Sequence, residues 1–319
     1  MKPPFDIIVT AGPSLFPDGR LERMVELGAT IVRLNGAHLD WERAGDLLSS
    51  LRARIGGARL LLDLSGRKVR LTGLERPIRF EAGGTFVLKR GNLNFPQVLD
   101  QVSAGDPVTA LDGILSLEVV RASGETLELR SRTAGILSNG KGMHFRSAGI
   151  RLPPISSEEE ARIRALGKGV DLFGLSFVHA PEDVDYVQGC LGDADTRRLL
   201  PKIETSRALE QAGEIAGRVD AVLIDRGDLA SEIGMERSVE AVQAILKACK
   251  ASGKRCYVAT HFLRSMVENP VPTMSEIFDL HFMLSMGIDG IQFSDETAVG
   301  AHPEACMGFL VQALARRDA

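Results

Sequence analysis

The chain has 319 residues, of which 44% are hydrophobic and 25% are charged, and its formal net charge is −4 at pH 7. This is ordinary globular composition; because Lys and Arg are scattered and no apolar run approaches the ~18 residues of a spanning helix, we expect neither a nucleic-acid nor a membrane partner. The N-terminal stretch MKPPFDIIVTAG lacks the apolar core of a signal peptide and the four cysteines show no CxxC spacing, so we expect a cytoplasmic protein with reduced thiols.

Short apolar strands alternate with amphipathic helices at both ends of the chain. In chain order, the expected strands are Asp6–Thr10, Thr30–Leu34, Arg59–Leu62, Asp171–Ser176, Leu199–Lys202, Ala221–Ile224, Cys256–Ala259 and Gly290–Phe293. Eight strand–helix units in roughly 250 residues predict an α/β fold, the (β/α)8 TIM barrel, with the barrel formed by residues 1–73 and 146–319.

Residues 74–145 break this rhythm after the third expected strand. Segments such as RFEAGGTFVLKR and ETLELRSRTAGIL alternate with a period near two, and Gly-Asp and Asp-Gly pairs mark turns. We predict a small inserted antiparallel β-barrel domain. Because it leaves the barrel at the face that carries TIM-barrel active sites, we expect it to act as a lid that excludes water, the alternative being a decoration without function.

Charged residues follow the expected barrel strands at their carboxyl ends. Glu204 and Asp228 come from separate strands and offer the sparse oxygen ligation of Mg²⁺ or Mn²⁺ completed by a substrate. The N–H groups of Gly227 and Asp228 open the helix after the sixth strand, are expected to be free, and could hold a carboxylate. Four cations at the same rim indicate a highly anionic substrate, such as a phosphorylated acid: Arg33, Lys68, Arg70 and Lys202. The alternative is that these acidic and basic residues form salt bridges with one another and bind no ligand.

These stretches resemble the motifs of the pyruvate kinase family. RLNGAH resembles the family's RLNFSH, PKIET resembles SKIEN, IDRGDLASEI resembles VARGDLGVEI, and ATHFLRSM resembles ATQMLESM. The matches run in order from Val9 to the last helix and include the inserted β domain. The chain is therefore identified as a member of this family that lacks its C-terminal domain, which often carries allosteric effector sites.

The resemblance implies phosphoryl transfer between phosphoenolpyruvate and ADP, giving pyruvate and ATP, with Mg²⁺ or Mn²⁺ held by Glu204 and Asp228. The implied catalytic residues are Lys202, which would stabilise the phosphoryl group in flight, Arg33 and Arg70, which would clamp phosphate, and Thr260, beside the enolpyruvate carbon. The implied substrate-binding residues are Ser176, Lys202, Asp225, Gly227, Asp228, Thr260 and His261. The implied nucleotide-binding residues are Pro13, Asn35, His38 and Lys141.

One departure from the family concerns K⁺, which many members hold with Asn, Ser, Asp and Thr side chains. Here Ala37 and Leu64 replace two of those ligands, and Lys68 stands at a nearby position usually occupied by Glu. A lysine ammonium can take the place of a monovalent cation, so Lys68 with Asn35 and Asp63 implies a K⁺-independent enzyme. The alternative is an ordinary surface lysine.

Other departures fall near substrate and subunit contacts: Asp225 replaces an Ala, His261 a Gln, and Val299 a Lys near the nucleotide phosphates. Two alternatives to a pyruvate kinase-like phosphotransferase therefore stay open. One is a diverged metal-dependent lyase, aldolase or transferase acting on a phosphoenolpyruvate- or 2-oxo-acid-like compound, and the other is a non-catalytic ligand-binding regulator. Because DLHFML replaces a family stretch that packs barrel against barrel, we expect either a monomer or a barrel-mediated homodimer.

Overall fold

The computed structural model describes residues 5–17, 19–111, 114–145, 150–192 and 198–317. The chain divides into two compact units, one formed by Met1–Ser65 with Ser157–Ala319 and the other by Gly66–Ser156. The inserted domain predicted at residues 74–145 lies within the second unit. No helix in the described part of the chain is long and apolar enough to cross a membrane.

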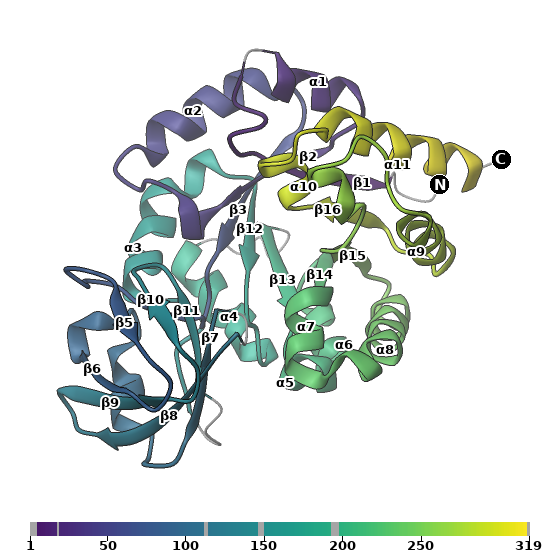
Figure 1. Cartoon of the computed structure of the whole chain (residues 1–319). Coiled ribbons are helices and arrows are strands. Elements are labelled where there is room, and N and C mark those ends of the chain that lie inside the picture. The colour runs from purple at the N-terminus through teal and green to yellow at the C-terminus, as the bar shows by residue number, and fades with distance from the viewer. Residues whose placement is uncertain (1–4, 18, 112–113, 146–149, 193–197, 318–319) are drawn as a thin grey trace. The chain divides into compact units, whose positions relative to one another are not determined.

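The first unit is a closed barrel of eight parallel strands, with neighbours in the order β1, β2, β3, β12, β13, β14, β15 and β16 (Figure 1). The strands are β1 Asp6–Thr10, β2 Ile31–Asn35, β3 Arg59–Leu64, β12 Leu172–Leu175, β13 Leu199–Ile203, β14 Ala221–Asp225, β15 Arg255–Ala259 and β16 Gly290–Phe293. Each predicted strand overlaps an observed one, so the predicted (β/α)8 barrel is confirmed.

Helices surround this barrel and bury their apolar faces against it (Figure 1). In α8, for example, the buried residues recur at the spacing of a single helix face: Ala241, Val242, Ile245, Leu246 and Cys249. The helices are α1 Arg20–Glu26, α2 Ala44–Arg54, α3 Ser157–Leu166, α4 Pro181–Leu191, α5 Ser206–Glu210, α6 Ala212–Gly217, α7 Arg226–Ile233, α8 Ser238–Ala251, α9 Met274–Ser285, α10 Asp295–Ala298 and α11 Pro303–Arg317. All four cysteines are free and buried, as predicted.

The barrel interior changes from apolar to polar along the strands. One apolar layer contains Ile8, Ile31, Leu61, Leu172, Leu200, Leu223 and Tyr257. Side chains in a strand alternate between its two faces, so the residues two positions later face the same interior. Those residues are Thr10, Arg33, Asp63, Gly174, Lys202, Asp225 and Ala259. The strand period thus assembles these seven residues into a second layer, here called the polar layer, at the carboxyl end of the barrel. This is the end that carries TIM-barrel active sites.

A second polar cluster lies at the opposite end of the barrel, around Asp6, which is only 4% exposed. Its carboxylate accepts hydrogen bonds from the hydroxyls of Thr30 and Tyr257, both at 2.6 Å, and pairs with Arg59 at 2.9 Å and Arg255 at 2.6 Å. Burial alone would raise the pKa of Asp6, but the two hydroxyls and two guanidinium groups outweigh burial and hold this pKa below its usual value. The cluster therefore stabilises the barrel as long as Asp6 is ionised.

Replacing Asp6 with Asn is expected to lower the free energy of unfolding by about 2 kcal/mol, because the two guanidinium groups lose a shared buried carboxylate. A depressed pKa contributes stability above the unfolded-state pKa and loses it as pH falls through the folded-state pKa, so the difference from wild type should shrink under acid. Urea unfolding at pH 7 and pH 3 measures both effects. The matched control is Asp220→Asn, whose side chain is 59% exposed and 3.9 Å from Lys254; equal losses in the two variants would contradict the prediction.

The second unit is antiparallel throughout. Six strands pair in the order β4, β11, β7, β8, β9 and β6, and β10 pairs separately with β5. The strands are β4 Val69–Arg70, β5 Ile78–Phe80, β6 Thr85–Lys89, β7 Pro107–Ala110, β8 Leu115–Ala122, β9 Thr126–Ser131, β10 Gly135–Leu137 and β11 Gly142–Phe145. Leu115, Leu117 and Val119 alternate with less buried residues and enter a core of this unit's own. The predicted inserted antiparallel domain is confirmed, and its role as a lid stays a prediction.

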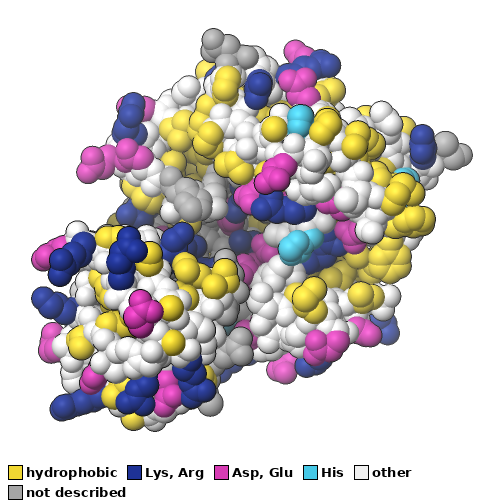
Figure 2. Space-filling view, in the orientation of Figure 1, with side chains coloured by type: hydrophobic (Ala, Val, Ile, Leu, Met, Phe, Trp, Pro, Cys, Tyr) yellow, Lys and Arg dark blue, Asp and Glu magenta, His cyan; other side chains and the backbone are white. Residues whose placement is uncertain are grey.

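An exposed apolar row runs along α9. Met274 and Phe278 are each 70% exposed and Phe282 is 45% exposed, and their four-residue spacing places them on one face of the helix. Figure 2 shows hydrophobic side chains gathered at the place of α9. Phe282 belongs to the DLHFML stretch for which an altered partner contact is expected, and the oligomeric state stays a prediction.

Candidate active site

A buried ion cluster joins three of the barrel strands. Arg33 donates from Nε to Oδ2 of Asp63 at 3.0 Å and from Nη1 to Oγ1 of Thr10 at 3.0 Å. Lys202 Nζ lies 3.2 Å from the same Asp63 oxygen. Burial would raise the pKa of Asp63, but Lys202 and Arg33 outweigh burial and lower it. Two cations thus share one carboxylate, and Lys202 Nζ also lies 3.8 Å from Glu204 Oε2.

Gly174 makes room for this cluster. It lies in register with Asp63 on the neighbouring strand, and a Cβ at Gly174 would lie 2.2 Å from Asp63 Oδ1. That separation is far below van der Waals contact, so any larger residue must displace the carboxylate. The glycine inside the strand sequence DLFGLS was a signal of such a close approach, although the sequence prediction did not use it.

Gly174→Ala is expected to destabilise the protein by about 1–3 kcal/mol, the usual cost of overpacking a filled interior. The matched control is Gly189→Ala in α4, where no atom of the described residues lies within 4 Å of the added Cβ; it should be neutral or stabilising by up to about 1 kcal/mol. Urea denaturation of both variants measures these changes. A Gly174 variant as stable as the Gly189 variant would show that the Asp63 position is not sterically fixed.

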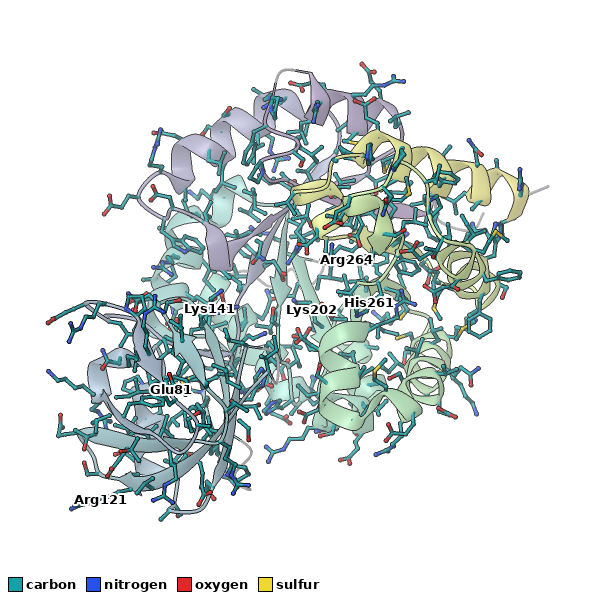
Figure 3. All side chains as sticks on the ribbon, in the orientation of Figure 1. Glu81, Arg121, Lys141, Lys202, His261 and Arg264 are labelled. Carbon is teal, nitrogen blue, oxygen red and sulfur yellow. The ribbon has the colours of Figure 1, made fainter. Side chains whose placement is uncertain are left out.

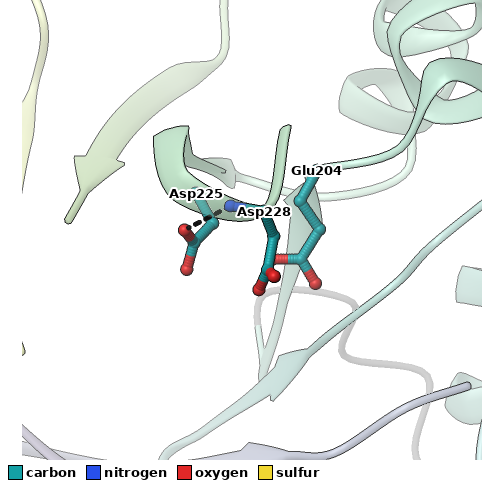
Figure 4. A group of neighbouring side chains, drawn as sticks. All are labelled: Glu204, Asp225 and Asp228. Carbon is teal, nitrogen blue, oxygen red and sulfur yellow. Dashed lines mark hydrogen bonds between the residues drawn. The ribbon is translucent and has the colours of Figure 1, made fainter. Parts of the chain in front are cut away.

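Three carboxylates gather beside this cluster. Glu204, Asp225 and Asp228 each offer one oxygen, and these oxygens all lie within 4.8 Å of one another. Figure 4 shows the carboxyl groups of Glu204 and Asp228 next to each other, with that of Asp225 at the start of α7. The structure therefore brings together the two predicted metal ligands and adds a third carboxylate that was predicted only as a substrate contact.

Glu204 is completely buried and only half satisfied. Its Oε1 accepts the N–H of Phe177 at 2.6 Å, whereas Oε2 has no hydrogen-bond partner among the described residues and lies 3.8 Å from Lys202 Nζ. Burial raises the pKa of Glu204 to about 8, against the opposing charge of Lys202 and with the support of Asp225 and Asp228. A divalent cation that favours oxygen ligands would satisfy the orphan oxygen and offset the mutual repulsion, so the residues fit Mg²⁺ or Mn²⁺.

The start of α7 does not present free N–H groups, and that part of the sequence prediction was wrong. Asp225 caps the helix: its Oδ1 accepts from the N–H of Gly227 at 3.2 Å and from that of Asp228 at 3.4 Å. The N–H of Gly227 also lies 3.0 Å from Thr260 Oγ1. A short acidic side chain just before a helix competes for its first N–H groups, so Asp225 already fills the position expected for a ligand carboxylate.

The loop after β15 is held in an unusual backbone conformation. Thr260, His261 and Leu263 have φ of 67°, 60° and 52°, in the left-handed region that non-glycine residues seldom adopt and that often marks functional sites. Arg226 braces this loop by donating from Nη2 to the carbonyl of Thr260 at 2.6 Å and from Nη1 to Asp279 at 2.8 Å. The Thr260 hydroxyl is thereby placed 3.2 Å from Asp225 Oδ1. Arg226 is thus a positioning residue, which its place in the RGD motif had not revealed.

His261 is exposed and lies near the start of α7. A Cβ on Gly227 would lie 3.2 Å from His261 Nε2, so the glycine keeps that space open. Figure 3 shows His261 and Lys202 at the same end of the barrel. The structure therefore brings His261 close to the predicted site without giving it a described hydrogen-bond partner there.

The remaining predicted residues are placed less centrally. The Ser176 hydroxyl donates to the Leu64 carbonyl at 2.6 Å, and Asn35 Oδ1 accepts the N–H of Ala37 at 3.1 Å. Pro13 is exposed, and the side chain of His38 lies outside the described part of the chain. Three residues belong to the second unit, and their roles toward the barrel site stay predictions: Lys68, Arg70 and Lys141.

Comparison with known proteins shows which family the chain resembles. The family described as "Pyruvate kinase, barrel domain" matches residues 4–307. The pyruvate kinase of Aeropyrum pernix is 32% identical over 317 residues, covering 95% of this chain and 68% of that protein. Those of Eimeria tenella and Thermotoga maritima are 31% and 30% identical, each over 93% of this chain and over 60% and 67% of their own lengths. The chain thus spans between 60% and 68% of the length of these three relatives.

Proposed function

Because this chain belongs to the pyruvate kinase family, and with it to the phosphotransferases, we propose that it transfers a phosphoryl group between phosphoenolpyruvate and ADP, giving pyruvate and ATP. The observation that carries this proposal is the placement of Lys202, whose Nζ lies 3.2 Å from Asp63 and 3.8 Å from Glu204. A buried cation beside a carboxylate cluster suited to a divalent metal gives two positive centres at one barrel end. Such a pair suits the charge of a phosphoryl group in transfer.

Each catalytic role rests on a position in the polar layer. Burial would lower the pKa of Lys202, but Asp63, Glu204 and Asp225 outweigh burial and raise it, so the side chain stays charged at neutral pH. Lys202 stabilises the transferring phosphoryl group, and Arg33, fixed by Asp63 and Thr10, supports it as a second cation. Glu204 and Asp228 would hold Mg²⁺ or Mn²⁺, which would supply charge neutralisation for the phosphoryl group.

Further roles complete the proposal. Thr260 lies beside the enolpyruvate carbon that becomes protonated, and Arg70 clamps phosphate. The proposed substrate contacts are Ser176, Lys202, Thr260 and His261. Lys68, with Asn35 and Asp63, replaces a monovalent cation, which is supported by the pairing of Asn35 and Asp63 in adjacent strands. The proposed nucleotide contacts are Pro13, Asn35, His38 and Lys141.

A coupled assay with phosphoenolpyruvate, ADP and Mg²⁺ in the absence of K⁺ tests the proposal directly. Pyruvate formation is expected, with no further stimulation when K⁺ is added. The purified Lys202→Met variant controls for contaminating host enzyme. Absence of pyruvate formation with every nucleoside diphosphate would refute the phosphotransferase function, whereas activity only with K⁺ would refute the Lys68 role alone.

A second candidate function is favoured by Asp225, because this carboxylate occupies donors that an enolpyruvate carboxylate would need. In that case the chain acts as a metal-dependent lyase, aldolase or transferase on a 2-oxo-acid-like compound. It then should catalyse metal-dependent exchange of the methyl protons of pyruvate with solvent deuterium, with no response to ADP. Proton NMR in D₂O measures this exchange, and a regulator without catalytic function would show ligand binding and no exchange.

A further inference from the structure

Three carboxylates lie together at the polar layer, beside Lys202: Glu204, Asp225 and Asp228. Each offers one oxygen, and these oxygens all lie within 4.8 Å of one another. Among the described residues, the fully buried Oε2 of Glu204 has no hydrogen-bond partner. A buried orphan oxygen within a group of three carboxylates indicates a divalent cation as its partner.

Asp225 has two functions in this arrangement. Its Oδ1 accepts the first N–H groups of α7 and lies 3.2 Å from Thr260 Oγ1, so one side of the carboxylate is occupied by donors. The same residue supplies one of the three oxygens that lie within 4.8 Å of one another. Because Asp225 is only 8% exposed, its charge is shielded little by solvent and acts strongly on the cluster.

We propose that Asp225 determines the ligand specificity of this site by serving as a third carboxylate ligand of the divalent cation and as an internal competitor of ligand carboxylates. The inference rests on the metal site of the proposed function and adds a role for Asp225 to it. An anion that chelates the cation through a carboxylate must displace Asp225 from both the cation and the α7 N–H groups. Ligands that reach the cation through a phosphoryl or carbonyl oxygen alone meet less competition.

The two parts of this role have opposite energetic consequences. A third carboxylate strengthens cation binding, because affinity for a hard cation rises with the charge of its ligands. The same carboxylate weakens the binding of a further anion, because the cation's charge is already largely neutralised and the helix donors are occupied. Removing the Asp225 carboxylate should therefore weaken metal binding and strengthen carboxylate binding.

Calorimetric titration of the full chain with Mn²⁺, and then of the Mn²⁺-saturated protein with oxalate, tests both parts. Asp225→Gly and Asp225→Asn are the variants, because Gly and Asn are both tolerated at a helix start and should preserve α7. In both variants the Kd for Mn²⁺ should rise about tenfold. The oxalate Kd should fall about tenfold in Asp225→Gly, which has no side chain, and by less in Asp225→Asn, whose amide oxygen still accepts the N–H groups.

Opposite changes in the two affinities separate this role from a structural defect, which would weaken both. The control variant Asp6→Asn, at the other end of the barrel, should leave both unchanged. Any pattern other than weaker Mn²⁺ binding with stronger oxalate binding overturns the inference. The binding measurements do not depend on turnover. If the wild type turns over phosphoenolpyruvate but the Asp225 variants do not show the opposite changes in affinity, this inference alone is overturned. If the variants show those changes but the wild type has no turnover, the phosphotransferase function alone is overturned.

Discussion

Replacing Lys202 with Met is expected to reduce turnover of phosphoenolpyruvate about a hundredfold to a thousandfold. Lys202 is a buried cation placed where charge develops on the transferring group, and the loss of one such donor typically costs about 10²–10³ in kcat. Steady-state kinetics with saturating Mg²⁺ measure the effect. Because the interaction acts in the transition state, kcat should fall far more than KM rises.

The same substitution should also destabilise the fold, which must be separated from the catalytic loss. Without Lys202, the fully buried Glu204 loses a neighbouring cation, and where this carboxyl is ionised, above about pH 8 in the metal-free protein, removing one partner of the buried pair costs up to about 3–5 kcal/mol. The double variant Lys202→Met with Glu204→Gln removes both charges and should recover most of that stability without recovering activity. If the double variant regains turnover along with stability, Lys202 acts on the fold and not on the reaction.

Stability of the metal-free protein is expected to fall as pH rises from about 4.5 to about 8. Burial raises the pKa of Glu204 to about 8, so the folded state keeps this proton over a range in which the unfolded chain loses it. The unfolded state then binds fewer protons, and the free energy of unfolding decreases with pH, by up to about 5 kcal/mol across this window. Urea unfolding at several pH values, in the presence of a chelator, measures the slope.

Glu204→Gln should remove this slope, because the amide does not titrate, while also removing the stabilisation by Mg²⁺. In the wild type, Mg²⁺ should stabilise increasingly as pH approaches about 8, since the ion requires the deprotonated carboxylate. The surface variant Glu26→Gln, whose side chain is 64% exposed, should retain both the pH slope and the response to Mg²⁺. A Glu204 variant with an unchanged slope would show that another buried group titrates in this range.

The sequence predicted the barrel because its signals are local. Each apolar strand and amphipathic helix is read from a few consecutive residues, and the carboxyl ends of parallel strands must share one end of a closed barrel. The convergence of Lys202, Glu204 and Asp228 follows from that rule without knowledge of any contact. The inserted antiparallel unit was predicted for the same reason, from its period of two and its turn residues.

Contacts within the site depend on information that no local pattern carries. Asp63 neutralises Lys202 because barrel closure sets which inward-facing residues share a layer, and Gly174 leaves the room for its carboxylate. Asp225 was predicted to contact the substrate, yet its side chain caps α7. The Thr260 hydroxyl lies 3.2 Å from Asp225 Oδ1 because Arg226 holds the loop after β15. The sequence by itself determined the fold and the charged residues at the strand ends. Only the tertiary structure decided which of those charges neutralise one another, because pairing depends on distances of a few ångströms between residues far apart in the chain.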